Sequence, residues 1–112
     1  MHYHAHVYWT NEAQRNQALH IRELLAQLGC NLGRVMDMPI GPHPLPMYQA
    51  NYSSANQTAV EAMLEKEAQD LSILLHEDTG DDVHDHTEGV RWLGTPLELD
   101  IAWLEEYQKH KH

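Results

Sequence analysis

The chain has 112 residues, 42% of them hydrophobic, which is enough for one domain with a modest core. Seventeen acidic and seven basic residues give a formal net charge of −10, which repels nucleic-acid phosphates and anionic membranes. We therefore expect a single domain over residues 1–112 that binds neither. A lone cysteine, no leader sequence and no apolar run near the roughly 20 residues of a membrane span favour a soluble, cytoplasmic protein.

The first predicted strand, residues 3–9, carries histidines on one face and apolar side chains on the other. Side chains alternate between the two faces of an extended strand, so His4, His6 and Tyr8 share one face. The residues between them supply core-forming side chains. One strand thus combines a pair of imidazoles with a contribution to the core.

Alternating helical and strand patterns continue through the middle of the chain. Capping-box spacing predicts the starts of two helices, at Asn11 with Gln14 and at Ser54 with Gln57. Apolar stripes at helical spacing follow both starts, and apolar alternation marks the strands. After the first strand we predict a helix, two strands, a second helix and a fourth strand at residues 11–28, 32–38, 47–52, 53–69 and 71–76.

This βαββαβ order is that of ferredoxin-like domains, an α+β class in which helices cover one face of an antiparallel sheet. In the usual strand order the first strand lies between the third and fourth, which places His4 near His76. The proline-rich loop 39–46 must fold over the open face for His43 to join them. We expect that face to be too polar for a second core, because it carries His4, His6, Tyr8, Gln49, Asn51, Ser72 and His76.

The last third of the chain is less regular. The acidic segment 77–88 lacks the spacing of a calcium-binding EF-hand, and we interpret it as a loop leading to a short helix that ends near residues 93–94, with Asp85 as a candidate cap. Apolar alternation over residues 97–101 fits a strand, whereas the spacing over 101–107 fits a helix. The polar tail 108–112 is expected to fray, which completes a short C-terminal extension.

The histidines indicate a metal site. Imidazole is a common ligand of iron, copper, nickel and zinc, and non-haem iron(II) sites often combine two histidines with a carboxylate. A lone His-x-His pair on a polar face is more often solvated. His43 between two prolines and His76 at a strand end lie where a rigid backbone can hold a ligand. Arg34 and Arg91 are rare cations here, and each either holds a substrate carboxylate or forms a surface ion pair.

Three blocks of residues occur in the order of a known family. They are Tyr3-His4-Ala5-His6-Val7-Tyr8, Gly41-Pro42-His43-Pro44 with Met47-Tyr48-Gln49, and His76 through Thr79-Gly80-Asp81-Asp82 to Asp85-His86-Thr87 with Trp92-Leu93-Gly94. The chain therefore resembles the small fungal and bacterial type of the DOPA 4,5-dioxygenase family. The resemblance implies a ferredoxin-like homodimer that cleaves a DOPA-like or caffeate-like catechol in extradiol fashion with non-haem iron(II) and O₂.

The resemblance also implies roles for five histidines. A catechol and O₂ need open coordination positions, so the protein supplies about three ligands, which we predict to be His6, His43 and His76. We predict His4 and His86 as catalytic acid–base residues, with His4 alternatively a ligand. Zinc or another divalent metal can replace iron(II) in a purified sample.

Two other interpretations stay open from the sequence. The chain could be a non-catalytic, dimeric, ferredoxin-like protein that holds a metal or a small ligand without turnover. In the simplest interpretation the open sheet face is only a dimer interface.

Overall fold

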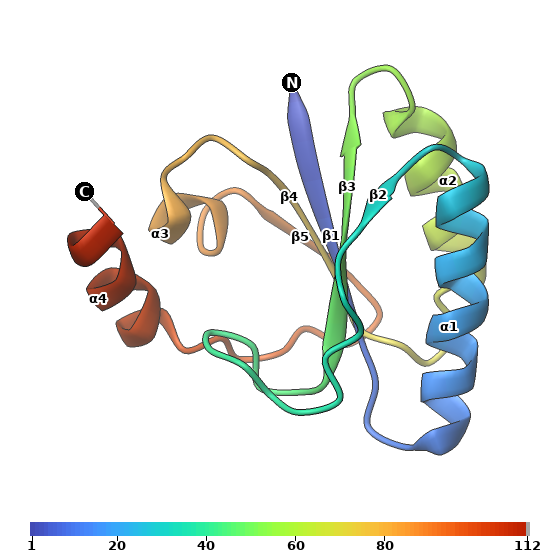
Figure 1. Cartoon of the computed structure of the whole chain (residues 1–112), viewed down its shortest axis with the longest axis horizontal. Helices are drawn as coiled ribbons and strands as arrows, with labels where there is room; N and C mark the ends of the chain where they lie inside the picture. The colour runs from blue at the N-terminus through green and yellow to red at the C-terminus, as the bar shows by residue number, and fades with distance from the viewer. Residues whose placement is uncertain (112) are drawn as a thin grey trace.

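A five-stranded sheet separates two groups of helices in residues 1–111, the part of the chain that the computed structural model describes (Figure 1). In chain order the elements are β1 (His2–Tyr8), α1 (Glu12–Gln27), β2 (Asn31–Leu32), β3 (Met47–Ser53), α2 (Gln57–Glu67), β4 (Ile73–Glu77), α3 (Asp82–Asp85), β5 (Val90–Leu93) and α4 (Ile101–Lys111). α1 and α2 lie on one side of the sheet, and α3 and α4 lie on the other. Within these residues, no helix is long and apolar enough to cross a membrane.

The strand order is β2-β3-β1-β4-β5, and every neighbouring pair is antiparallel. The first strand is therefore central, between β3 and β4. This is the predicted ferredoxin-like arrangement, with α1 and α2 on one face and a C-terminal extension after β4. The predicted α+β fold class is confirmed.

The strand register places the polar side chains of three strands on one face. His4 lies opposite His76 of β4 and Asn51 of β3, and His6 lies opposite Gln49 of β3. Directly opposed residues of antiparallel strands point to the same face of a sheet. The predicted proximity of His4 and His76 is thus confirmed as a consequence of pairing between β1 and β4.

α1 begins where the capping pattern predicts. The Asn11 side chain accepts a hydrogen bond from the Gln14 amide at 2.9 Å, and the Gln14 side chain accepts one from the Thr10 amide at 2.8 Å. These bonds satisfy amides that have no partner inside the helix. The helix then packs an apolar face on the sheet, and the buried core between them and α2 includes Ala5, Val7, Ile21, Leu25, Tyr48, Ala50, Val60, Leu64 and Ile73.

The opposite face of the sheet is half apolar, which the sequence analysis did not predict. Tyr8, Met47 and Leu74 are buried there and form a second, smaller cluster. They are covered because β5 extends the sheet and later segments fold over it. The side chains that pack against this cluster are Leu45, Val90, Trp92, Leu97 and Leu99.

Two predicted boundaries in the first two-thirds of the chain are wrong. The strand predicted over 32–38 is reduced to β2 and one isolated bridge between Met36 and Met47. The α2 cap is Asn56 rather than Ser54, and no side chain forms a capping hydrogen bond there. Ser54 instead donates its amide hydrogen to the Met1 carbonyl, which draws it out of the helix.

The C-terminal third departs further from the predictions. No helix ends near residues 93–94: the single-turn α3 is followed by β5, and Asp81 rather than Asp85 caps α3. For residues 97–107 the sequence left a strand and a helix as alternatives, and the structure has a helix. This helix, α4, begins at Ile101, and Asp100 caps its first turn. α4 continues through residue 111, so the described part of the predicted frayed tail is helical, and His112 lies outside the described residues.

The turn after β5 allows a direct test of the packing. Gly94 has φ +71°, and a Cβ at this position would overlap the Leu71 carbonyl oxygen. We expect Gly94→Ala to lower the free energy of unfolding by more than about 2 kcal/mol, because strain and overlap act together. Gly80→Ala is the control: Gly80 also has positive φ, at +91°, but open space surrounds it. Urea unfolding measures both, and equal losses would contradict this packing.

Candidate metal centre

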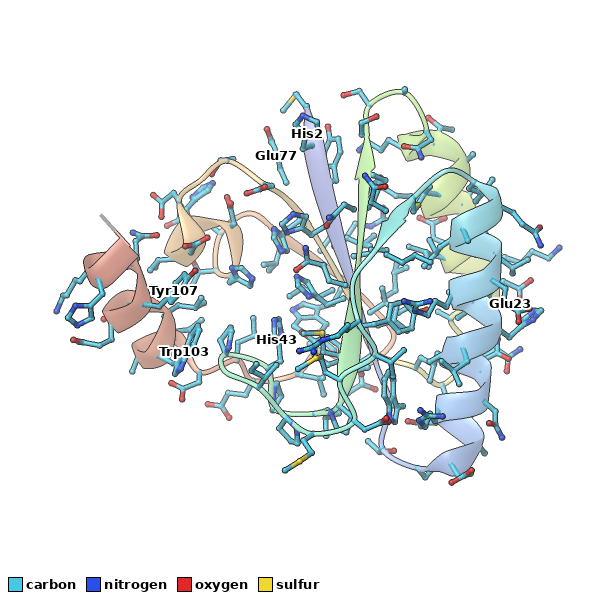
Figure 2. All side chains as sticks on the ribbon, in the orientation of Figure 1. His2, Glu23, His43, Glu77, Trp103 and Tyr107 are labelled. Carbon is cyan, nitrogen blue, oxygen red and sulfur yellow. The ribbon has the colours of Figure 1, made fainter. Side chains whose placement is uncertain are left out.

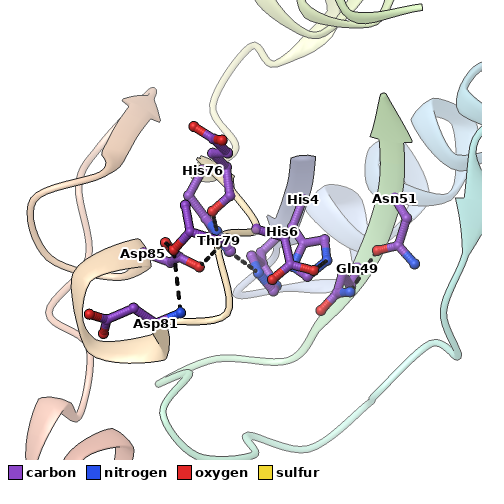
Figure 3. A network of polar contacts seen from close by, with 10 residues as sticks. His4, His6, Gln49, Asn51, His76, Thr79, Asp81 and Asp85 are labelled. Carbon is purple, nitrogen blue, oxygen red and sulfur yellow. Dashed lines mark hydrogen bonds and ion pairs between the residues drawn. The ribbon is translucent and has the colours of Figure 1, made fainter. Parts of the chain in front are cut away.

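All five histidines selected from the sequence lie together on the face of the sheet opposite α1 and α2. His4 and His6 come from β1 and His76 from β4, and Figure 3 shows their side chains converging. His43 comes from the proline-rich loop, which folds over this face as predicted, and His86 follows α3 directly. Segments far apart in the chain therefore supply a single cluster of imidazoles.

His6 occupies the centre of this cluster. The centroid of its ring lies 4.5 Å from that of His43, 5.2 Å from His76, 5.8 Å from His86 and 6.1 Å from His4. The Nε2 atoms of His6 and His76 are only 3.0 Å apart. His6, His43 and His76 are also buried, with 2%, 7% and 4% of their surfaces exposed.

The nitrogens form two overlapping groups with the spacing of metal ligands. One contains His4, His6 and His76, and the other contains His6, His43 and His86; within each, the candidate ligand atoms lie within 4.8 Å of one another. The predicted ligand set draws His43 and His76 from different groups. His6 belongs to both, so it is the residue that any ligand set here has in common.

Backbone carbonyls fix the protonation of two rings. His76 Nδ1 lies 3.0 Å from the Glu77 carbonyl oxygen, and His86 Nδ1 lies 2.7 Å from that of Asp82. A carbonyl can only accept, so Nδ1 carries the hydrogen in both rings and Nε2 of each neutral ring keeps a lone pair. This is the second-sphere pattern that orients histidine ligands in metal sites.

His6 carries a nitrogen that the protein leaves unsatisfied. Its Nδ1 is buried and has no hydrogen-bond partner among residues 1–111. Its Nε2 lies 3.0 Å from His76 Nε2 and, in the metal-free protein, donates its hydrogen to the lone pair of that nitrogen. Neutral imidazoles at this spacing, with an orphaned nitrogen among them, fit a divalent transition metal.

Burial keeps His6, His43 and His76 neutral, which ligation requires. Desolvation, with a smaller contribution from neighbouring imidazoles, lowers the pKa of His43 to about 3 and that of His6 well below its ordinary value. Desolvation also lowers the pKa of His76 to about 4, although its hydrogen bond to Glu77 acts in the opposite direction. The pKa of His4 is lowered for the same reason, against the attraction of Asp78.

Two residues outside the five histidines support the cluster, and the role of Tyr8 was not predicted from the sequence. The Tyr8 hydroxyl lies 2.7 Å from His43 Nδ1 and orients that ring; burial raises the pKa of Tyr8, so the hydroxyl stays protonated. Asp85, 2% exposed, accepts hydrogen bonds from the Thr79 hydroxyl and amide at 2.6 and 2.8 Å. These bonds close the loop between β4 and α3 and so fix His86. The sequence suggested Asp85 as a residue that orients a ligand, but it did not predict the bonds with Thr79.

A cavity of about 210 Å³ opens beside the cluster. A larger cavity, about 570 Å³, lies along the proline-rich loop, but of the five histidines only His43 reaches it, so the chemistry belongs to the smaller one. Trp103 and Tyr107 of α4 line the smaller cavity as a stacked pair with centroids 5.1 Å apart (Figure 2). Gly41 makes room for the Trp103 ring, which lies where a Cβ of residue 41 would stand.

The chain is similar to the proteins of one known family. A sequence model of the Dopa 4,5-dioxygenase family matches residues 3–103, a range that includes all five histidines. The chain belongs to this family. The sequence resemblance is therefore confirmed.

Two curated fungal proteins are similar to this chain. It is 30% identical over 110 residues to a DOPA 4,5-dioxygenase of Amanita muscaria, covering 92% of this chain and 48% of the relative. It is 29% identical over 119 residues to an uncharacterized 21.2 kDa protein of Botryotinia fuckeliana, covering 95% and 64%. The chain thus spans only about half to two-thirds of the length of these curated relatives.

A solved structure from the bacterium Nostoc punctiforme, described as a candidate dioxygenase, superposes closely on this family member. The TM-score is 0.90 at 40% sequence identity, with 95% of this chain and 92% of the other covered. This similarity extends to the C-terminal elements that the sequence analysis did not resolve. It supports the same fold.

The lowered pKa values predict acid sensitivity of the metal-free protein. Below pH 6.5 the unfolded chain protonates these imidazoles, whereas folded His76 and His43 stay neutral until about pH 4 and about pH 3. Proton uptake by the unfolded state then lowers the free energy of unfolding as pH falls from 6.5 to about 4.

His43→Leu should reduce this pH dependence by up to about 1.4 kcal/mol per pH unit, the value for one proton. Urea unfolding between pH 4 and 8 measures it, with His20→Leu, at an exposed position on α1, as the matched control. If the free energy of unfolding of His43→Leu changes with pH as steeply as that of the wild type, His43 is not held neutral in the folded protein.

Proposed function

We propose that this protein is an extradiol ring-cleaving dioxygenase that uses non-haem iron(II) and O₂ to open a DOPA-like or caffeate-like catechol. The observation that carries the proposal is the convergence of five imidazoles around buried His6. Burying several polar rings with an unsatisfied nitrogen costs free energy that an apolar core would not, so a structural role explains them poorly. Membership of the family supplies the independent support.

The donor set suits iron(II). His6, His43 and His76 remain the proposed ligands, and the Tyr8 hydroxyl and the Glu77 carbonyl would orient two of them. With few protein ligands, bound iron would supply open positions for catechol and O₂ and the redox chemistry that joins them. Zinc or another divalent metal could occupy the same nitrogens in a purified sample.

His4 and His86 are the proposed acid–base residues. His4 Nε2 lies 3.4 Å from the Asp78 carboxylate, which can stabilise a proton on the ring. The Asp82 carbonyl holds the hydrogen of His86 on Nδ1, which leaves Nε2 able to accept a proton. Either ring can take the proton of a catechol hydroxyl and return it to the product. The cavity of about 210 Å³ suits a single aromatic ring with a short side chain.

The simplest alternative, an open face that serves only as a dimer interface, fits the structure less well. The protein's own loop, α3 and α4 already lie over that face, and His6 is 2% exposed in the isolated chain. The homodimer itself remains a prediction from the family resemblance, as does a cytoplasmic location from composition. A metal-binding protein without turnover remains the alternative that experiment must exclude.

The proposal predicts oxygen-dependent ring opening. Protein loaded anaerobically with iron(II) and mixed with catechol, DOPA or caffeate should, on admission of air, consume O₂ and form a yellow ring-opened semialdehyde. His6→Ala should reduce the rate by at least about a hundredfold, because the shared ligand is lost. His20→Ala, on the exposed face of α1, should keep wild-type activity.

Two results would reject the proposal. Neither O₂ uptake nor colour with any of the three compounds would exclude the dioxygenase. Metal bound at His6 without turnover would favour the non-catalytic binding protein.

A further inference from the structure

We infer that Trp103 and Tyr107 of α4 bind the aromatic ring of the substrate and hold it with its two oxygens toward the histidines. The inference rests on the proposed function, because it assumes that the oxygens of a catechol bind at the histidine cluster. It goes further by giving α4, which carries none of the five histidines, the role of selecting an aromatic ring.

The cavity beside the histidines is polar on one side and apolar on the other. The side chains that the sheet contributes to its lining are all polar: His4, His6, Gln49 and His76. Those from α4 are apolar or aromatic: Trp103, Leu104 and Tyr107. The oxygens of a catechol occupy one edge of its ring, so oxygens bound at the imidazoles leave the opposite edge pointing away from the sheet. α4 then offers the apolar surface against which that part of the ring packs.

The two rings of α4 form a stacked pair that is open to solvent. Trp103 and Tyr107 lie one helical turn apart, with ring centroids 5.1 Å apart and an angle of 8° between the ring planes. They are 41% and 47% exposed, whereas Leu104, next to Trp103, is 3% exposed. Leu104 therefore supplies the packing of α4, and the larger rings line the cavity, where Figure 2 shows them between α4 and the sheet. Another aromatic ring is stabilised here by edge-to-face or offset contact and by the removal of apolar surface from water.

Trp103 has a fixed position relative to His43. A Cβ on Gly41 would stand 2.8 Å from the indole, so the ring lies directly against the backbone of the proline-rich loop. The Asp100 amide, just before α4, donates a hydrogen bond of 2.9 Å to the Pro42 carbonyl. His43 is the next residue of that loop. The contacts that hold the start of α4 therefore also set the distance between the indole and the imidazoles.

A contact with the ring predicts a preference that metal binding alone does not produce. Catechol and acetohydroxamate both bind a metal through two oxygens, but only catechol has an aromatic ring. A good aromatic contact is worth up to about tenfold in affinity. A change in the aromatic residues of α4 should therefore weaken the binding of catechol and spare that of acetohydroxamate.

The test measures both affinities in zinc-loaded protein, which does not turn over, by calorimetric titration. Trp103→Leu should weaken catechol binding about tenfold, and Tyr107→Leu about threefold because its ring is smaller, with less than about a twofold change for acetohydroxamate. Trp103→Phe keeps an aromatic ring and should lose less than about threefold for catechol. The matched control is Tyr3→Leu, which removes one ring of the Tyr3–Tyr52 stack on the opposite face of the sheet and should change neither affinity.

Proton NMR gives a second readout, because zinc is diamagnetic. The ring protons of bound catechol should show nuclear Overhauser contacts with the Trp103 indole in the wild type, and these contacts should vanish in Trp103→Leu. Four results would overturn the inference: equal losses for catechol and acetohydroxamate, unchanged catechol affinity in Trp103→Leu, no contact with the indole, or no binding of catechol to the wild type.

The outcomes for this inference and for the proposed function can be told apart. If the zinc-loaded protein shows the predicted losses but the iron-loaded protein consumes no O₂, the dioxygenase fails and the role of α4 stands. If the iron-loaded wild type and Trp103→Leu open catechol with the same kcat/KM, the dioxygenase stands and the role of α4 fails.

Discussion

The burial of His6 in the central strand is the constraint on which the site depends. β1 pairs with β3 and β4, so each of its residues has neighbours on both sides. Its alternation sends Ala5 and Val7 into the core beneath α1 and α2 and turns His4 and His6 to the opposite face. A shift of one residue would exchange the two faces. The same apolar burial that fixes the register therefore fixes the position of the imidazoles.

Stability and site chemistry oppose each other at His6. A neutral imidazole with an unsatisfied buried nitrogen destabilises the folded chain, and the close approach of other rings adds to this when any of them is protonated. Hydrogen bonds offset part of the free energy lost by burying the cluster. The backbone carbonyls of Glu77 and Asp82 accept hydrogen bonds from His76 and His86, and the fold already holds these carbonyls in place. A metal bound only by the folded state would stabilise the protein by mass action.

Alternation and capping predict most of the fold. The faces of β1, β3 and β4 follow from period-two patterns, and the α1 cap follows from the spacing of Asn11 and Gln14. The cluster of five histidines was also predictable, although its members came from the family blocks rather than from periodicity alone. What the sequence could not supply was the distribution of the nitrogens into two groups that share His6, because this depends on ring orientations set by tertiary contacts.

The C-terminal third was poorly predicted for a physical reason. Its acidic run has no apolar period, so β5 is recognisable only through its pairing with β4. The Asp85–Thr79 bonds and the Trp103–Gly41 contact likewise join residues whose relation no local pattern reveals. These segments supply one wall of the cavity. β1 and β4 supply three of the five histidines that line this cavity.

The most direct test of the central claim is the position of iron in anaerobically loaded crystals, found from anomalous differences collected above and below the iron absorption edge. The account predicts a peak bonded to a nitrogen of His6 and to at least two further imidazoles of the cluster. No peak at His6, or iron held only by surface groups such as His110, would contradict it.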